Sequence, residues 1–323
     1  MVPELSRNAA MRRLLLMIAI SAAALVGSIP RGRALATQRS GLGSAPSAKD
    51  APPTDVELRA FIDRVVANQH ADDAALPLYQ RMEQRQVRDH ASDATPSEDK
   101  TFRVIPIGTG SGWRVLVEDH GHPVSAADYQ AQIVNVERAL ELITDPTNEK
   151  SKRDLEKYRH HLKDRADLIN AAREGYLFTW AGRESRDGRT LIKIRMDPNP
   201  NFKPTSRETE VFSHTVVTIW VDESSAHVAR IEAQLNSDIG VGGGVIGKAY
   251  RGSHLTIEQS EVAPGVWLPS RLQYDLTIRK FLFSSEIHEH IEDSQYVRIG
   301  APSEALAFIR RELTPAVGPR AQQ

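Results

Sequence analysis

The sequence predicts an α+β protein in which an antiparallel sheet with one apolar face is partly covered by helices. Apolar and polar residues alternate over long stretches of the second half, for example over 268–278, which indicates strands buried on one side only. Between residues 125 and 172 the apolar spacing becomes helical instead. A chain of 323 residues with 40% hydrophobic residues is also long enough to bury a substantial core.

The first 36 residues have the pattern of an export signal. Arg12 and Arg13 precede an apolar run from Leu14 to Ile29, and Ala34-Leu35-Ala36 then supplies a small-x-small cleavage pattern. This run is shorter than the ~20 apolar residues of a membrane-spanning helix. The pattern therefore favours a cleaved signal peptide, with an N-terminal membrane anchor as the alternative. An exported chain without cysteine contains no disulfide and no lipid-modified N-terminal cysteine.

The net charge argues against a nucleic-acid partner. Removing the first 36 residues takes away five of the 41 basic and one of the 42 acidic residues, which leaves 36 and 41. A net charge of about −5 provides no overall attraction to nucleic acid or to an anionic membrane.

The first predicted helix follows a segment with little to bury. Residues 37–54 are rich in Ser, Gly, Ala and Pro and predict a disordered linker. Thr54 and Glu57 then match a capping box, and the helix that follows is expected to end at a loop over 71–77. Its apolar face is predicted to comprise Leu58, Phe61, Ile62, Val65 and Val66.

The next elements are three strands and two helices. Strands are expected over 78–88, 102–107 and 113–118, the last two joined by a hairpin at Gly108 to Gly112. Ser125 has the character of a helix start. Apolar residues at helical spacing predict two helices within 125–172, an antiparallel pair inserted into the sheet: Tyr129, Ile133, Val136, Leu140, Leu155, Tyr158, Leu162 and Ile169.

From Tyr176 onward the pattern is almost entirely strand and turn. Asp187-Gly188 suits a tight hairpin between strands at 176–184 and 190–197. Further strands are expected over 215–221, 228–236, 250–262, 268–278 and 281–292. A last helix, capped by Ser303, is expected to reach Leu313, with a flexible tail over 314–323.

A glycine-rich stretch, GVGGGVIGKAYRG at 240–252, is close to a phosphate-binding loop. Ala249 stands where the Mg²⁺-binding hydroxyl belongs, and a strand is expected to follow where the motif requires a helix. The stretch is therefore better interpreted as a connection between antiparallel strands. Ser111 in GTGSG likewise lacks the context of a nucleophile, since Thr109 precedes it and no helix follows.

The remaining candidate for chemistry is a pair of histidines. His288 and His290 are two residues apart on a predicted strand, so both point to one side and can share a metal with Glu286 or Glu292. A third ligand from elsewhere would be needed, and a polar strand face is solvated in any case. The sequence thus assigns no catalytic residue, no metal site and no cofactor, and a metal-dependent enzyme is the least favoured hypothesis.

Two segments resemble a known family. VTIWVDESSAHVARIEAQL at 216–235 contains a strand ending in W-x-D and a strand with V-x-R-I-E, and APGVWLPSRLQYDL at 263–276 contains P-G-V-W-L-P. Together with the export signal, they resemble the lipoprotein-carrier superfamily (LolA/LolB-like), specifically an uncharacterised branch of exported bacterial proteins. The resemblance implies a curved antiparallel sheet, an incomplete barrel, with helices covering a concave face that holds acyl chains. At the level of architecture it extends over roughly 53–313, and the domain is expected over 55–313, with 125–172 as a helical insertion.

The functional expectation follows from that resemblance. The chain is expected to be a periplasmic, non-catalytic protein that binds or carries a lipid, an acylated protein or another apolar ligand. An envelope scaffold with a closed core, whose helices at 125–172 contact a partner protein, is the alternative. The apolar face expected to meet the ligand comprises Val217, Ile219, Ile231, Leu268, Leu272, Tyr274, Leu276, Phe281 and Phe283.

Overall fold

A computed structural model describes residues 52–110, 112–241, 247–280 and 283–314. The predicted leader, nearly all of the linker and all but one residue of the tail lie outside these residues. The described residues contain five α-helices: α2 (Asp55–Ala75), α3 (Ala126–Thr144), α4 (Glu149–Gly175), α5 (Arg207–Glu210) and α6 (Pro302–Leu313). They also contain two short 3₁₀ helices, η1 (Leu76–Leu78) and η2 (Val211–His214).

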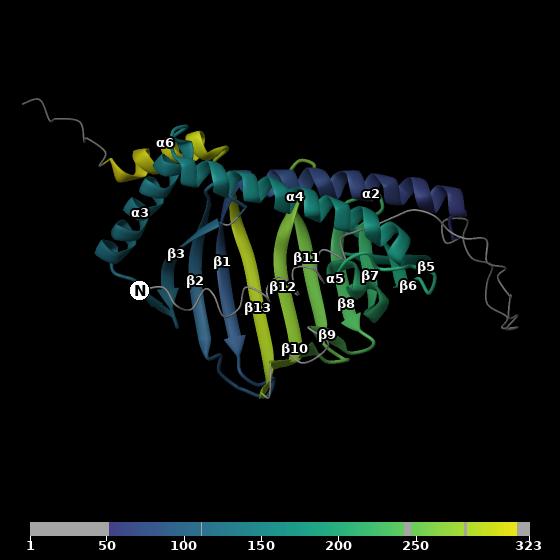
Figure 1. Cartoon of the computed structure of the whole chain (residues 1–323). Coiled ribbons are helices and arrows are strands. Elements are labelled where there is room, and N and C mark those ends of the chain that lie inside the picture. Colours follow the sequence, from purple (N-terminus) through teal and green to yellow (C-terminus); the bar gives the residue numbers. More distant parts are fainter. Residues whose placement is uncertain (1–51, 111, 242–246, 281–282, 315–323) are drawn as a thin grey trace, which may run out of the picture. The chain divides into compact units, whose positions relative to one another are not determined.

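The strands form one open antiparallel sheet, which confirms the predicted α+β class (Figure 1). Along the hydrogen-bonded path the order is β4-β3-β2-β1-β13-β12-β11-β8-β7-β6-β5, and β10 pairs with β12 and β9. The sheet is curved, and among the described strands it is not closed into a barrel. The strands are β1 (Tyr79–Arg88), β2 (Glu98–Pro106), β3 (Gly112–Asp119), β4 (His122–Pro123), β5 (Tyr176–Arg186), β6 (Arg189–Pro198), β7 (Thr215–Asp222), β8 (Val228–Leu235), β9 (Ile239–Val241), β10 (Gly247–Ala249), β11 (His254–Ala263), β12 (Val266–Lys280) and β13 (Phe283–Arg298).

The chain divides into two compact units. Unit 1 consists of Met1–Ala71, Arg165–Trp267 and Tyr274–Glu286, and unit 2 of Asp72–Asp164, Leu268–Gln273 and Ile287–Gln323. Unit 1 therefore holds most of α2 and the strands from β5 to β11. Unit 2 holds β1 to β4, α3, α6 and most of β13.

Local signals in unit 1 have the predicted structure. The Thr54 hydroxyl accepts a hydrogen bond from the Glu57 amide at 3.3 Å, and the Glu57 carboxylate accepts one from the Thr54 amide at 2.8 Å, which is the expected capping box. The turn between β5 and β6 places Asp187 at φ 51° and Gly188 at φ 75°, as a tight hairpin requires. The helix does not end in a loop at 71, however; it continues to Ala75 and into η1.

The core of unit 2 lies between α3, α6 and one face of β2 and β3. Eight residues are buried together: Ile105, Val115, Ile133, Val136, Leu140, Ile299, Ala305 and Ile309. The apolar face of α3 is occupied in this way, and α3 packs against α6 and β3. The cap of α6 also differs from the prediction. Ala301 is the N-cap, and its amide donates to the Glu304 carboxylate at 2.8 Å.

The helices at 125–172 have an unexpected place in the topology. They follow β4 and precede β5, and these two strands are the opposite ends of the sheet order. The segment is therefore the connection between the two edge strands. An insertion between neighbouring strands would have left β4 and β5 adjacent.

Candidate functional site

The apolar face of unit 1 is built by strand register. Ile219 on β7 lies opposite Ile194 on β6 and Ile231 on β8, and Val217 lies opposite Met196 and Ala233. Side chains of directly paired residues lie on the same face of a sheet. All six are at most 2% exposed, so they form one continuous apolar surface.

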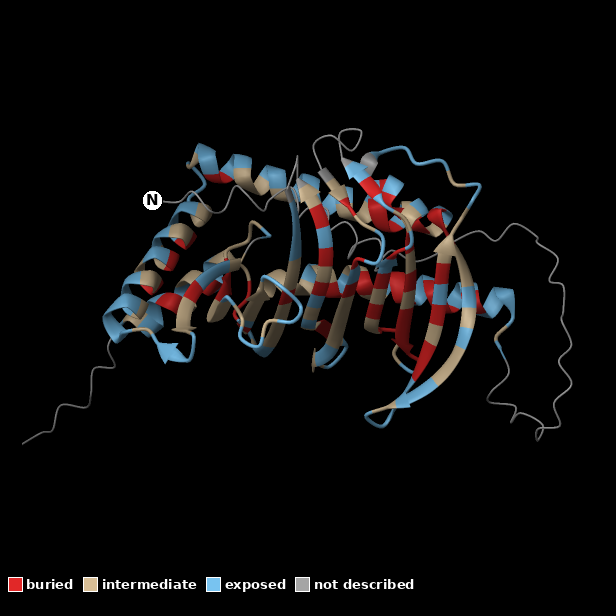
Figure 2. Cartoon of the chain, turned by 90° about the horizontal axis from the view of Figure 1, so that it is seen from below, coloured by how far each residue is buried: buried red, intermediate tan, exposed pale blue. Residues whose placement is uncertain are grey.

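Helix α2 covers this surface. Figure 2 shows buried residues along α2 and along the strands of unit 1 that it crosses. Near its C-terminal end, the Asn68 side-chain amide donates to the Ser225 carbonyl at 2.8 Å and to the Ala226 carbonyl at 3.1 Å, in the turn between β7 and β8. Gln69 and Asp72 of α2 are buried, and the buried apolar side chains of α2 are the five predicted from helical spacing, each at most 9% exposed: Leu58, Phe61, Ile62, Val65 and Val66.

The nine residues predicted from the sequence to meet a ligand do not all lie in one unit. Val217, Ile219, Ile231, Tyr274 and Leu276 belong to unit 1 and are at most 6% exposed. Leu268, which is buried, and Leu272, which is half-buried, belong to the part of β12 in unit 2. Phe281 and the side chain of Phe283 lie outside the described residues.

The two segments that carried the family resemblance include turns at one end of unit 1. Arg189 contacts the carboxylates of Asp222 at 3.3 Å and Glu261 at 2.8 Å, so it joins the turn after β7 to the end of β11. Its guanidinium lies 5.0 Å from the centre of the Trp267 ring. The His227 ring stacks on Trp267, with centroids 5.7 Å apart and planes at 11°.

Local hydrogen bonds set the protonation of this turn cluster. Burial disfavours a charged Asp222, but the hydroxyls of Ser224 and Ser225, the Ser225 amide and Arg189 outweigh it, and the pKa of Asp222 is lowered. The Gly265 amide is the main cause of the lowered pKa of Glu261. Burial lowers the pKa of His227, which keeps its ring neutral near pH 7. The cluster therefore consists of groups with fixed charge that hold turns in place, and Asn68 attaches α2 to one of those turns.

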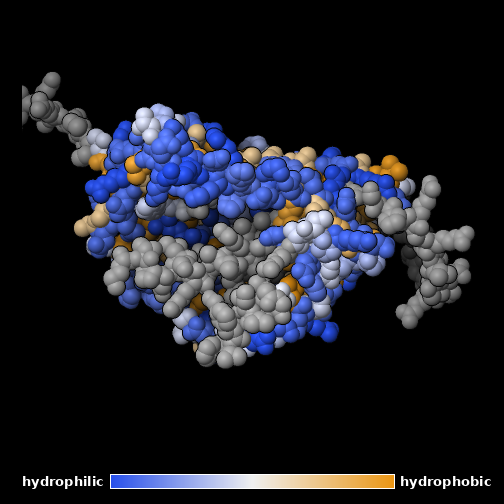
Figure 3. All heavy atoms as spheres, viewed as in Figure 1, coloured by the Kyte–Doolittle hydropathy of each residue, from blue (hydrophilic) through white to orange (hydrophobic). Residues whose placement is uncertain are grey.

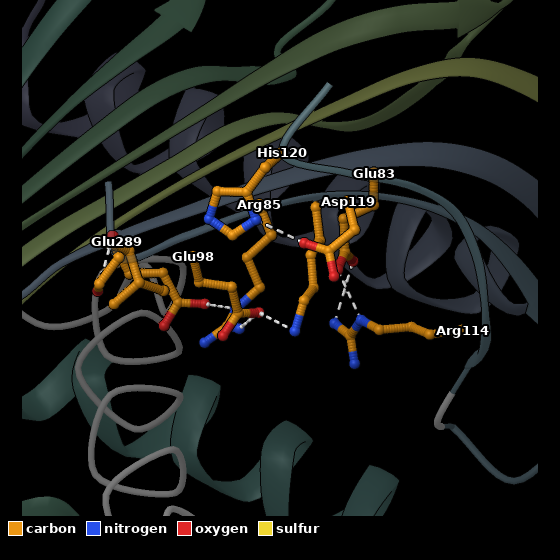
Figure 4. A network of polar contacts seen from close by, with 10 residues as sticks. Glu83, Arg85, Glu98, Arg114, Asp119, His120 and Glu289 are labelled. Atoms are coloured by element: carbon orange, nitrogen blue, oxygen red, sulfur yellow. Dashed lines mark hydrogen bonds and ion pairs between the residues drawn. The ribbon is translucent and has the colours of Figure 1, made fainter. Parts of the chain in front are cut away.

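Unit 2 has a different sheet face, which carries ion pairs (Figure 4). Arg85 lies between Glu98 and Glu289, and its Nε is 2.5 Å from the Glu289 carboxylate. Arg114 donates twice to Glu83, at 2.6 and 3.0 Å. These contacts link β1 to β2, β3 and β13.

Arg81 and Asp293 extend this network on β1 and β13. Their side chains are 2.8 Å apart. Burial, opposed in part by Arg81, raises the pKa of Asp293 to about 6. Burial likewise raises the pKa of Tyr296, whose hydroxyl donates to the Pro269 carbonyl at 2.6 Å. The charged members of this face are mostly inaccessible, since Glu83 and Glu289 are 1% and 6% exposed.

The sequence contained a signal for this network that alternation alone did not reveal. Strand periodicity along β13 puts Ile287 and Ile291 on one face, and the same period puts Glu289 and Asp293 there too. Charged residues at positions of the apolar face predict buried partners. The identity of those partners, Arg85 and Arg81, depends on the pairing of β13 with β1 and is not visible in either segment.

The other candidate motifs form no site among the described residues. Gly240 and Lys248 pair across β9 and β10, so the glycine-rich stretch flanks a small antiparallel pairing, and no helix follows it; residues 242–246 lie outside the description. His290 contacts Glu292 at 3.1 Å, and His288 lies on the same strand face. Within the described ranges no three His, Asp or Glu side chains are placed to hold a metal ion.

No family model and no curated protein matches the chain. Several solved structures are similar to it. A putative outer membrane lipoprotein-sorting protein domain from Vibrio parahaemolyticus is 10% identical, with a TM-score of 0.30 over 71% of this chain and 91% of that one. A LolA superfamily protein from Nitrosomonas europaea is 13% identical, with a TM-score of 0.27 over 76% and 96%.

A DUF1329 family protein from Desulfovibrio piger is 10% identical, with a TM-score of 0.27 over 74% of this chain and 92% of that one. One of them belongs to the superfamily that the segments at 216–235 and 263–276 resemble. At TM-scores of this size the likeness does not bear on function. Over residues 52–110, 112–241, 247–280 and 283–314, no helix is both long and apolar enough to cross a membrane.

Proposed function

We propose that this chain is an exported, non-catalytic protein of the bacterial cell envelope that binds the apolar part of a lipid or acylated ligand between α2 and the apolar face of unit 1. The observation that carries the proposal is a continuous apolar sheet face in a unit where the apolar side chains of α2 are buried and Asn68 attaches α2 to the turn between β7 and β8. A ligand chain can take the place of that helix because both offer apolar surface to the same strands.

The energies of the two occupants are similar. Five apolar side chains of α2 are buried, and at roughly 2 kcal/mol each their burial contributes ~10 kcal/mol. An acyl chain of about 14 methylenes contributes ~11 kcal/mol at ~0.8 kcal/mol each. Exchange of α2 for a ligand is therefore close to balanced, and the polar attachment at Asn68 adds to the stability of the covered state.

Two measurements test the proposal. Solvent extraction of the chain purified from its native host, followed by mass spectrometry, should yield a bound lipid. Titration of the lipid-free chain with a fluorescent long-chain fatty acid should show saturable binding. Asn68→Ala should increase its apparent affinity about fivefold, because lifting α2 no longer breaks two hydrogen bonds worth ~1 kcal/mol together.

Asn170→Ala is the matched control, since Asn170 is an exposed helical asparagine of unit 1 and its replacement should leave the affinity unchanged. Absence of lipid from the extract, together with no fatty-acid binding by either the unaltered chain or Asn68→Ala, would reject the proposal.

The proposed envelope location rests on the leader pattern and has its own test. N-terminal sequencing of the exported chain should find a new terminus after Ala36 if the leader is cleaved there. A mature chain that retains Met1 or Met11 and fractionates with membranes would favour the anchor instead.

The envelope scaffold is a second candidate, favoured by the complete burial of Val217, Ile219 and Ile231. Deletion of 125–172 is not a suitable test of it. Ile133, Val136 and Leu140 of α3 are fully buried in the core of unit 2, so the deletion would unfold that unit. Saturable fatty-acid binding decides between the two candidates, because a closed core has no room for the probe.

A further inference from the structure

A buried hydroxyl in unit 1 is left without a hydrogen-bond partner. Polar groups usually face solvent, and the surface that Figure 3 shows in colour is mainly hydrophilic. Tyr176, the first residue of β5, is instead 1% exposed. Within the described part of the chain no atom is placed to form a hydrogen bond with its hydroxyl. Such a group lowers stability, because burial removes its hydrogen bonds to water and the fold returns none.

Strand register places Tyr176 on the apolar face of unit 1. Tyr176 pairs with Pro198 on β6, and Phe178, two residues further along β5, pairs with Met196. Met196 in turn lies opposite Val217 on β7, so β5, β6 and β7 present these side chains on one face of the sheet. The hydroxyl therefore belongs to a residue at the border of the surface on which the proposed ligand lies.

A second buried hydroxyl at the same end of this face has the usual arrangement. Thr215, the first residue of β7, is two positions from Val217 and therefore on the same face, and it is fully buried. Its hydroxyl donates to the Val211 carbonyl at 2.8 Å. The fold thus supplies a partner for the Thr215 hydroxyl and leaves the Tyr176 hydroxyl without one.

The Tyr176 ring is held in place by aromatic contacts. Its centroid is 5.3 Å from that of Phe212 in η2, and the Phe212 ring is 5.8 Å from that of Phe202. A Cβ atom added at Gly175 would be 2.5 Å from the Phe212 ring, so the backbone just before Tyr176 also packs on it. Burial raises the pKa of Tyr176 above its ordinary value, so its hydroxyl keeps the proton and can serve as a donor.

We propose that the Tyr176 hydroxyl donates a hydrogen bond to the carbonyl oxygen at the head of an acyl ester whose methylenes lie on the apolar face of unit 1. This contact rests on the proposed function, because the chain must occupy that face before its carbonyl reaches Tyr176. It narrows the ligand from any apolar molecule to one that carries an acceptor oxygen at one end. An uncharged ester suits the position better than a carboxylate, since a charge beside Phe212 would lose its hydration.

The test compares the lipid-free unaltered chain with Tyr176→Phe in fluorescence titrations with two probes, a pyrene-labelled long-chain methyl ester and a pyrene-labelled alkane of the same length. Tyr176→Phe should weaken binding of the ester about five- to tenfold, because one hydrogen bond is lost, and should leave the affinity for the alkane unchanged. Tyr250→Phe is the matched control. It removes the hydroxyl of a half-buried tyrosine of unit 1 and should leave both affinities unchanged.

Thermal unfolding of the lipid-free chains separates a ligand contact from a structural one. Tyr176→Phe should leave the melting temperature unchanged or raise it, because it removes a hydroxyl that has no partner. Thr215→Val should lower the melting temperature by roughly 2–4 °C, because it leaves the Val211 carbonyl without its donor.

Three results would overturn the role of Tyr176. Equal losses of affinity for the two probes would show that its hydroxyl does not recognise the carbonyl. A melting temperature of Tyr176→Phe lowered as far as that of Thr215→Val, or a variant that does not fold, would show that the hydroxyl already has a partner in the lipid-free chain, a bound water molecule included. Undiminished binding of the ester by Tyr176→Phe would refute the contact and leave the proposed function standing, whereas failure of the unaltered chain to bind either probe would refute both.

Discussion

The sheet faces of the two units bury different kinds of side chain. In unit 1, Ile194, Ile219 and Ile231 form a surface without polar atoms, and helix α2 covers it. In unit 2, Glu83 and Glu289 are buried to the same degree but depend on individual guanidinium partners. Apolar surface accepts any apolar cover, whereas a buried charge needs one specific partner in one geometry.

That difference has a functional meaning. A face that accepts any apolar cover can exchange a helix for a ligand, so the proposed binding site lies in unit 1. An apolar ligand would not stabilise the face of unit 2, because the charges of that face are already paired. The ion pairs of unit 2 instead join β1 to β13, two strands that are more than 200 residues apart in the sequence, as the contact between Arg85 and Glu289 shows.

The most severe test of this contrast is Arg85→Met. It leaves Glu289 buried without its guanidinium and should lower the free energy of unfolding by about 3–5 kcal/mol, measured by urea denaturation. Combining it with Glu289→Leu should restore most of the loss, because the buried carboxylate that lost its Arg85 partner is then gone. A loss below about 1 kcal/mol in the single variant would mean that water reaches Glu289 and that this face is not a closed ionic network.

A core truncation in unit 1 should be nearly as costly. Ile219→Ala removes a fully buried side chain and should lower the free energy of unfolding by about 3 kcal/mol in the same assay. Thr218→Ala, on the opposite face of β7 and only half-buried, should cost less than about 1 kcal/mol. A cost for Ile219→Ala as small as that of the control would indicate that the covered face already contains free space.

The titration of Asp293 should contribute to the pH dependence of stability. Its pKa is raised from 3.8 to about 6, so between about pH 4 and pH 6 the folded chain holds a proton that the unfolded chain has lost. Stability from this group is thus greatest below pH 4, falls through that window, and is level above it. The change should be of the order of 1–3 kcal/mol.

The experiment compares the unaltered chain with Asp293→Asn by urea denaturation from pH 4 to pH 7. The difference between the two isolates Asp293 from carboxylates with lowered pKa values, such as Asp222 and Glu261, whose stabilisation is instead lost as the pH falls. If the difference in the free energy of unfolding between the two chains does not change with pH, the raised pKa of Asp293 is contradicted.

The smallest expected effects on stability come from replacing two glycines that both have a positive φ. Gly188 of unit 1 has φ 75° and no atom within 4 Å of an added Cβ, so Gly188→Ala should cost only the backbone strain, about 1 kcal/mol. Gly110 of unit 2 has φ 77° and the Tyr158 ring at 2.3 Å, so Gly110→Ala should cost about 1 kcal/mol more. Equal melting temperatures for the two variants would show that the loop does not depend on its packing against Tyr158.

Local sequence patterns were sufficient to predict individual elements. The capping box at Thr54 and Glu57, the turn at Asp187-Gly188 and the five buried apolar positions of α2 depend on residues within a few positions of one another, and all three predictions are confirmed. Alternation also identified the strand faces that carry Val217, Ile219 and Ile231, because a side chain changes face at every residue whatever the strand pairs with.

Long-range pairing was decided by the tertiary structure alone. The apolar period of α3 did not reveal that this helix packs on α6, because an apolar helix face is satisfied by any apolar surface and its period does not name the partner. The partners of Glu289 and Asp293 were hidden for a related reason, since they depend on the register between β13 and β1. The sequence therefore determined which residues avoid water, and only the folded chain determined what each of them meets.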